Sequence, residues 1–219
     1  LHNLSRWAST WQLKVNINKC NVLRVGKNCV FSDYELDSIT IPRVHKVTDL
    51  GIIINSNLKF SDYIDACVAR AYSRSFLIFK GFVCRDPNLL RKAFITYVRP
   101  LLEYNTFIWC PSDIGSITKI ENVQRRFTKR IAAISQLSYK DRLAYLGLDT
   151  LEYRRLKFDL IMFYKIVHNL VDVDRDSLIT FRPADTSTRN SYLKVLNLLV
   201  CLVYELTFYH FAALMFGII

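Results

Sequence analysis

The sequence is poor in the short motifs by which catalytic sites are recognised. Its six glycines are isolated from one another, which excludes a glycine-rich loop that could cradle a phosphate. Its four histidines do not cluster, and none lies in a local nucleophile motif. Polymerases hold two metal ions with paired carboxylates, and no segment resembles their Tyr-x-Asp-Asp hairpin. We therefore expect no catalytic residue in this chain.

Metal-binding patterns are also missing from the sequence. The six cysteines include no Cys-x-x-Cys pair, so neither a zinc site nor a disulfide framework is expected. Asp172, Asp174 and Asp176 alternate like the start of a calcium loop. That loop requires glycine and glutamate where this chain has Ser177 and Pro183. We expect reduced thiols, no metal site and no cofactor in this chain.

What the chain does have is an excess of positive charge. It carries 30 lysines and arginines against 19 aspartates and glutamates, a formal net charge of +11, and 51% of its 219 residues are apolar. An excess of this kind favours polyanionic partners, meaning nucleic acid or an anionic membrane surface.

The hydrophobic pattern predicts a short helical turn with Trp7 and Trp11, then short strands, and helices after them. Strands are expected up to about residue 56, in the alternating runs 13–26, 34–42 and 47–54, the last with a turn at Gly51. Helical spacing begins at about residue 57. The expected helices are 61–82, 88–109 (capped by Asp86-Pro87 and interrupted at Pro100), 117–134, 139–146 (ending at Gly147) and 151–170.

The clearest amphipathic helix is 117–134, which carries apolar side chains on one face, Phe127 among them. Its opposite face carries the cations Arg125, Arg126, Lys129 and Arg130. Such a face can neutralise backbone phosphates, giving an affinity that is independent of base sequence and falls with salt. A solvated surface without a partner is the alternative interpretation.

A second basic cluster begins the helix 151–170 and consists of Arg154, Arg155 and Lys157. It strengthens the phosphate-binding interpretation if the two helices pack side by side. No aromatic platform of the kind that stacks single-stranded bases is visible between the cations.

Several longer phrases occur together in a characteristic order. They are SRWASTWQLKVNINKCNVLRVG, VTDLGIIINSNLKFSDYI, AFITYVRPLLEYNTFIWCP, ITKIENVQRRFTKRI and LSYKDRLAYLGLDTLEYRRLKFDLIMFYKIVHNLVD. In this order and spacing the chain resembles the reverse transcriptases of LINE-type (non-LTR) retrotransposons, particularly the jockey and CR1-like groups. The resemblance covers about residues 1–172 and corresponds to the part after the catalytic hairpin.

The resemblance implies an α+β, mainly α, fold in which a small β-hairpin remnant of the palm precedes a helical thumb and a helical extension. The expected divisions are the palm end with a primer-grip-like hairpin (1–56), the thumb and connection-like region (57–172), a linker (173–194) and a hydrophobic tail (195–219). The implied function is that of a truncated RNA-directed DNA polymerase without its catalytic aspartates. It would at most bind an RNA/DNA template–primer duplex, with magnesium needed only by the intact parent enzyme.

The resemblance also gives roles to individual residues. Lys19 matches a lysine that follows the catalytic strands and can approach the nucleotide, an ordinary surface lysine being the alternative. Asp49 and Gly51 match the primer-grip turn. Thumb helices pack against the template–primer duplex, which favours Arg125, Arg126, Lys129 and Arg130 as phosphate contacts.

The tail departs from the family, because 195–219 has Glu205 as its only charged residue. Eroded coding sequence, a membrane-spanning helix and a buried core helix are three competing accounts of it. A nuclear or cytoplasmic protein is expected under the first, and a single-pass membrane protein under the second. A non-functional relic is a further alternative. Leu1 stands where an initiator methionine would be, so a fragment is expected, and the oligomeric state stays open.

Overall fold

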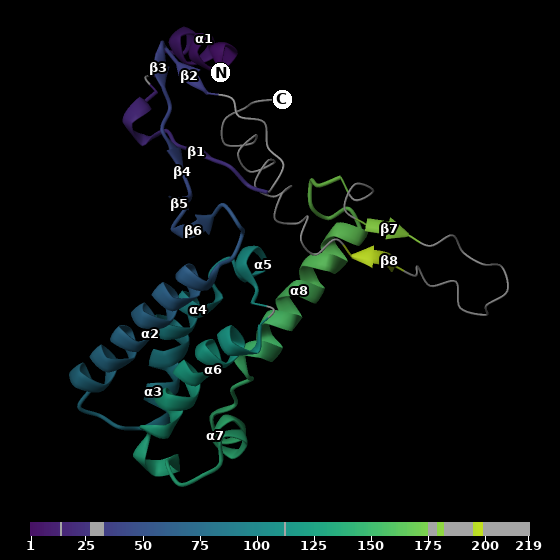
Figure 1. Cartoon of the computed structure of the whole chain (residues 1–219). Helices are drawn as coiled ribbons and strands as arrows, with labels where there is room; N and C mark the ends of the chain where they lie inside the picture. The colour runs from purple at the N-terminus through teal and green to yellow at the C-terminus, as the bar shows by residue number, and fades with distance from the viewer. Residues whose placement is uncertain (14, 27–32, 112, 175–178, 182–194, 199–219) are drawn as a thin grey trace, which may run out of the picture. The chain divides into compact units, whose positions relative to one another are not determined.

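The computed structural model describes residues 1–13, 15–26, 33–111, 113–174, 179–181 and 195–198 (Figure 1). The chain forms two compact units, Leu1–Tyr104 with Pro111–Leu151, and Asn105–Cys110 with Glu152–Ile219. Helices dominate the described residues, and the strands are short and paired in twos. The predicted α+β, mainly α, class is therefore confirmed.

The first unit begins with a helix and three small sheets. The sheets pair β1 with β4 in parallel, and β2 with β3 and β5 with β6 antiparallel. The elements are α1 (His2–Thr10), the 3-10 helix η1 (Ile17–Lys19), β1 (Val22–Leu23), β2 (Glu35–Leu36), β3 (Ile39–Thr40), β4 (Arg43–Val44), β5 (Lys46–Asp49) and β6 (Ile52–Asn55).

The strand predicted over 13–26 is wrong for most of its length. Only Val22–Leu23 pairs with another strand. The preceding backbone closes a local turn instead, with Lys19 N donating to Asn16 O at 3.0 Å and Cys20 N to Ile17 O at 2.9 Å. Because these amides bond locally, they are not available to a neighbouring strand.

The hairpin predicted over 47–54 is present. Asp49 pairs with Ile52, and the two residues between them, Leu50 (φ 45°) and Gly51 (φ 82°), have the positive φ of a two-residue hairpin turn. Ile52 and Ile54 are buried on one face of β6, as the alternation of a half-buried strand requires.

Most of the remaining helices belong to the first unit, and the two caps expected at Asp86 and Gly147 are present. The helix expected over 117–134 instead spans Ile114–Lys129, begins at an Asp113 cap and is followed by a separate 3-10 turn. Asp86 Oδ2 accepts from Leu89 N at 2.8 Å, and Gly147 ends its helix at φ 59°. The helices are α2 (Ser61–Gly81), α3 (Pro87–Ala93), the π-helical turn η2 (Phe94–Val98), α4 (Arg99–Glu103), α6 (Ile114–Lys129), the 3-10 helix η3 (Ala132–Ile134) and α7 (Tyr139–Leu146).

The helix expected over 88–109 is split, as Pro100 predicts. Pro100 lies in the first turn of α4, directly after the π-helical turn η2. Proline has no backbone N–H and its ring clashes with the carbonyl four residues earlier, so the extra residue of a π turn accommodates it. Asn105 then adopts φ 50° and ends the run before α5.

The core of the first unit centres on α2, η2, α4 and α6. Phe127 of α6 lies against Phe79 of α2 and Phe94 of η2, with ring centroids 4.9 and 4.8 Å apart. Leu90, Val98, Leu102 and Ile120 are fully buried around them. These rings fix α6 on α2 and so determine which side of α6 meets solvent.

The second unit contains α5 (Thr106–Trp109), most of α8 (Leu151–Val167), and the antiparallel pair β7 (Ile179–Phe181) and β8 (Val195–Leu198). β7 lies within the predicted linker and β8 at the start of the predicted tail. Residues 182–194 and 199–219 lie outside the described residues, so most of these two predicted segments does too. Among the described residues, no helix has the length and apolar character needed to cross a bilayer.

Candidate nucleic-acid interface

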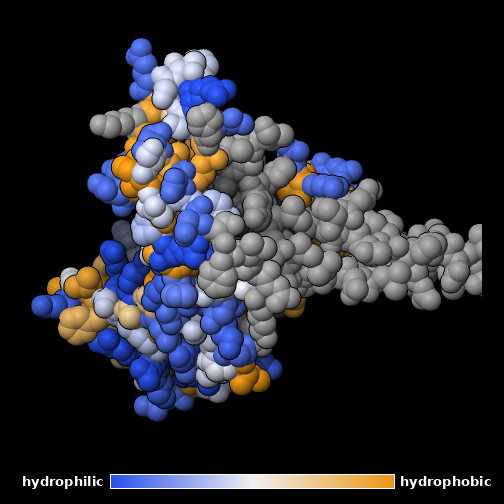
Figure 2. Space-filling model, turned by 45° about the horizontal axis from the view of Figure 1, so that its top comes forward, coloured by the Kyte–Doolittle hydropathy of each residue, from blue (hydrophilic) through white to orange (hydrophobic). Residues whose placement is uncertain are grey.

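The three cations of α6 and Arg130, which directly follows it, lie on the solvent side of the helix. Arg125, Arg126, Lys129 and Arg130 are exposed, while Phe127 is 2% exposed. The reason is the helical period, which places Val123, Gln124, Phe127 and Thr128 on the buried arc and the cations on the opposite arc. Figure 2 shows a largely hydrophilic surface over the helical part of the first unit.

The α2 and α6 helices run in the same direction, side by side. Asp65 of α2 pairs with Lys119 of α6, with 2.7 Å between Oδ1 and Nζ. Seven residues further along both helices, the guanidinium carbon of Arg126 lies 5.2 Å from the centroid of the Tyr72 ring. One edge of the cationic face therefore rests on side chains of α2.

The third contact of this series involves Arg130. Its guanidinium carbon lies 4.3 Å from the centroid of the Phe79 ring, seven residues beyond Tyr72. A guanidinium over an aromatic face is attracted by the ring quadrupole, by about 0.5–1 kcal/mol at an exposed site. These contacts favour the observed orientation of the two arginines on this edge.

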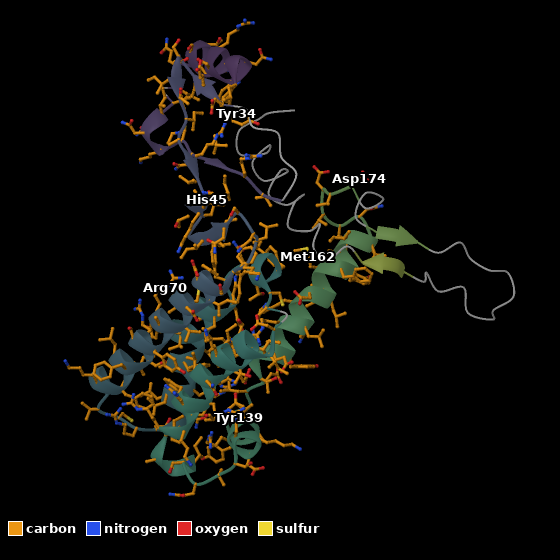
Figure 3. All side chains as sticks on the ribbon, in the orientation of Figure 1. Tyr34, His45, Arg70, Tyr139, Met162 and Asp174 are labelled. Carbon is orange, nitrogen blue, oxygen red and sulfur yellow. The ribbon has the colours of Figure 1, made fainter. Side chains whose placement is uncertain are left out.

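The other edge of the cationic face meets α7 and the loop before it. The guanidinium carbon of Arg125 lies 4.6 Å from the centroid of the Tyr139 ring, and Lys129 Nζ donates to Ser135 O at 2.6 Å. Figure 3 labels Tyr139. Three of the four cations therefore stand over aromatic rings, and all three rings come from other elements.

A buried polar network fixes the Tyr139 ring. Its hydroxyl donates to the buried carboxylate of Glu121, which also accepts from Leu151 N at 2.9 Å. Gln124 Nε2 donates to Tyr139 Oη at 3.1 Å and to Asp149 O at 2.9 Å. Burial and the neighbouring Glu121 raise the pKa of Tyr139 far above its usual range, so the hydroxyl stays a donor.

No carboxylate within the described part of the chain pairs with Arg125, Arg126, Lys129 or Arg130. The negative end of the α6 macrodipole offsets only about half an elementary charge near its last turn. The cationic face therefore keeps most of its four positive charges uncompensated.

The three residues of the second basic cluster differ in exposure and do not form one surface patch. Arg155 is 3% exposed, Arg154 is half-buried with its guanidinium carbon 5.4 Å from the centroid of the Phe158 ring, and Lys157 is exposed. These residues lie in the second unit, whereas the α6 cations lie in the first. Their binding of nucleic acid stays a prediction.

Arg155 has acidic and thiol neighbours in its own unit. Burial raises the pKa of Asp159, while a hydrogen bond from Cys110 and the charge of Arg155 oppose that rise. Cys110 Sγ donates to Asp159 Oδ2 at 3.5 Å. Burial and the charge of Asp159 raise the pKa of Cys110 to about 11, so this thiol is protonated at neutral pH.

The residues expected near a primer lie at the surface of the first unit. Asp49 and Gly51 flank Leu50 in the β5–β6 turn, and Tyr104 Oη donates to Leu50 O at 3.2 Å. Lys19 is exposed in η1 and makes no side-chain hydrogen bond or ion pair with any described residue. The Tyr104 tether was missed in the sequence, because no local signal links residues 54 positions apart.

The described residues contain no group of three or more His, Cys, Asp or Glu side chains placed to hold a metal ion.

Comparisons with known proteins find a distant likeness. An uncharacterized protein of Caenorhabditis elegans, B0403.1, is 25% identical over 130 residues, which is 58% of this chain. The chain spans 64% of that protein's length. No family model matches the chain, and no solved structure matches it.

Proposed function

We propose that this chain is the carboxy-terminal, non-catalytic end of a LINE-type retrotransposon reverse transcriptase, and that it binds the backbone of a template–primer duplex through α6. The observation that carries the proposal is the cationic face of α6. Its four cations are exposed and have no carboxylate partner among the described residues, and three stand over aromatic rings. The ordered phrases of the sequence supply the family.

The chemistry of the face suits phosphodiesters. Arginine offers a planar fork of donors that matches phosphate oxygens, and a ring beneath it restricts the side chain before binding, so less entropy is lost on contact. Residues 125 to 130 advance about 7.5 Å along the helix, over which one strand presents about two phosphates. Such contacts carry no base sequence information, as template–primer binding requires.

The test of binding is salt-dependent fluorescence anisotropy with a labelled RNA–DNA hybrid. Changing Arg125, Arg126, Lys129 and Arg130 to alanine should weaken binding and make the slope of log affinity against log salt shallower by about 0.9 per lost phosphate contact. A matched control removes four exposed cations elsewhere, Lys59, Arg74, Lys92 and Lys140. Equal losses in the two variants would mean that α6 has no special part.

The non-catalytic half of the proposal has its own test. The purified chain, given primed RNA template, magnesium and nucleotides, should not extend the primer, because its sequence contains no carboxylate hairpin for two metal ions. Robust synthesis would overturn this half of the proposal.

A further inference from the structure

The two parallel helices end at the same end of the helical unit. α2 ends at Gly81 and α6 at Lys129, and Phe79 and Arg130 are in contact there. Four exposed cations gather in the last turns and the residues that follow. We call them the cationic end: Lys80, Arg85, Lys129 and Arg130. Lys80 and Arg85 come from α2 and the α2–α3 loop, and so extend the cationic face beyond α6.

The cationic end carries more positive charge than the nearby negative groups can neutralise. Two helix carboxyl ends together offset about one elementary charge. Asp86 follows Arg85, but its carboxylate caps α3 through Leu89 N and lies in no ion pair among the described residues. Even when Asp86 is counted in full, about two positive charges remain without compensation.

Two of these cations converge on one aromatic ring. The guanidinium carbons of Arg130 and Arg85 lie 4.3 and 5.7 Å from the centroid of Phe79, and are therefore no more than about 10 Å apart. Arg85 Nη2 also donates to Phe79 O at 2.7 Å, at the carboxyl end of α2. Phe79 itself is buried against Phe127, so both arginines are supported by the core.

Like charges brought this close repel each other unless an anion lies between them or solvent screens them. Each guanidinium keeps donors beyond those used in the protein, because arginine has five side-chain N–H groups and the guanidinium of Arg130 has no hydrogen-bond acceptor among the described residues. Two forks of this kind over one buried ring can offer donors to the several acceptor oxygens of one phosphate.

We infer that Arg85 and Arg130 together bind one phosphate group, which is a backbone phosphodiester of the bound nucleic acid. The inference rests on the proposed function for the source of the phosphate. It adds a residue of the α2–α3 loop to the interface and assigns two cations to one shared contact. The competing account is that both arginines only neutralise the ends of α2 and α6.

A double-mutant cycle on hybrid binding tests the sharing. Arg85→Gln and Arg130→Gln should each weaken binding about ten-fold, the value of one hydrogen bond to a charged group. The double variant should lose little more than either single variant, and its salt slope should fall by about 0.9 and not about 1.8. Multiplying losses would overturn the inference and leave the proposed function standing. Arg74→Gln, at an exposed arginine of α2, is the matched control.

The hybrid affinity and the melting temperature of one further variant distinguish phosphate binding from neutralisation of the helix ends. Arg85→Lys keeps the charge but loses the fork, so it should bind the hybrid several-fold more weakly. Its melting temperature should fall little, because the positive charge at the end of α2 remains even though the bond from Nη2 to Phe79 O is lost. A variant that binds as well as wild type would overturn the inference. Circular dichroism of every variant checks that the helices remain.

A measurement with inorganic phosphate tests the same site without nucleic acid. At constant ionic strength, phosphate in place of chloride should raise the melting temperature of the wild-type chain by more than that of the double variant, whose smaller rise measures the general stabilisation by an excluded anion. If phosphate stabilises the chain but the chain does not bind the hybrid, the two arginines form a site for free phosphate and the proposed function is wrong. Absence of both effects would refute the two together.

Discussion

The cations of α6 and those of α8 look alike in the sequence but lie in different surroundings. In α6, both members of the pair Arg125-Arg126 are exposed, and each stands over a ring from another element. In α8, Arg155 is buried near Asp159 and Cys110, and its neighbour Arg154 lies over Phe158 of its own helix. Two adjacent arginines therefore form a surface in one helix and a partly internal group in the other.

This difference teaches that a basic run is informative only when its buried side is known. In α6, Phe127 occupies the core and turns the cations outward. In α8, large apolar side chains are themselves exposed, among them Leu156, Leu160 and Tyr164, and Arg155 takes an inner position. Such an exposed apolar row on α8 gives no reason to expect a phosphate contact there.

The largest expected effect comes from removing the side chain that orients α6. Phe127→Ala should lower the free energy of unfolding by about 3–5 kcal/mol, because it leaves a cavity between two other phenylalanines. Urea denaturation followed by circular dichroism measures it. Leu160→Ala, on the exposed row of α8, should cost below about 1 kcal/mol. Equal costs would contradict the contrast between the two helices.

The next effect concerns the arginines themselves. Arg155→Ala should destabilise the chain by about 1–3 kcal/mol, because it leaves the half-buried Asp159 without that cation. Arg126→Ala should change the stability by no more than about 0.5–1 kcal/mol, the strength of an exposed contact with a ring. Thermal or urea unfolding compares them. A larger loss for Arg126→Ala would reverse the comparison.

For binding of the hybrid, in contrast to stability, we expect the larger effect from the arginines of α6 and the smaller effect from the basic residues of α8. The double variant Arg125→Ala, Arg126→Ala should reduce the salt slope by about 1.8, if each side chain contacts one phosphate. The pair Arg154→Ala, Lys157→Ala should change it by about 0.9 or less, since only Lys157 of the two is exposed. Anisotropy titrations at four salt concentrations give both slopes. A larger reduction of the slope in the α8 double variant than in the α6 double variant would indicate that the nucleic acid binds the second unit.

The smallest expected effect concerns pH: the contributions of Asp113 and Asp159 to stability should change in opposite directions as the pH falls. The hydrogen bond from Ser116 N lowers the pKa of Asp113 at the start of α6, so its contribution is present above the ordinary value of 3.8 and is lost as pH falls through the lowered pKa. Burial raises the pKa of Asp159, so its contribution is present below 3.8 and is lost as pH rises through the raised pKa.

Unfolding midpoints between pH 7 and pH 2.5 (roughly the range over which carboxyl groups titrate) should therefore change in opposite directions in two variants. Asp113→Asn keeps the cap and should lessen the loss of stability in acid. Asp159→Asn should remove a penalty that appears as pH rises. Matching pH profiles for the two variants would show that their surroundings do not differ as described.

Much of the fold followed from local signals in the sequence. The caps at Asp86 and Gly147, the interruption at Pro100 and the turn at Gly51 were predicted because each depends on the backbone preferences of one or two residues. The strand predicted over 13–26 failed because alternation does not show whether a partner strand exists, and the local turn at Asn16 took the amides instead.

The sequence by itself determined that α6 is amphipathic and that Arg125, Arg126, Lys129 and Arg130 share its polar face, because that result needs only the helical period. Only the tertiary structure decided what supports them. Tyr72 and Phe79 come from α2, Tyr139 comes from α7, and Arg85 reaches Phe79 from a loop. These contacts join residues between 6 and 54 positions apart, and packing of one helix on another is what brings most of them together.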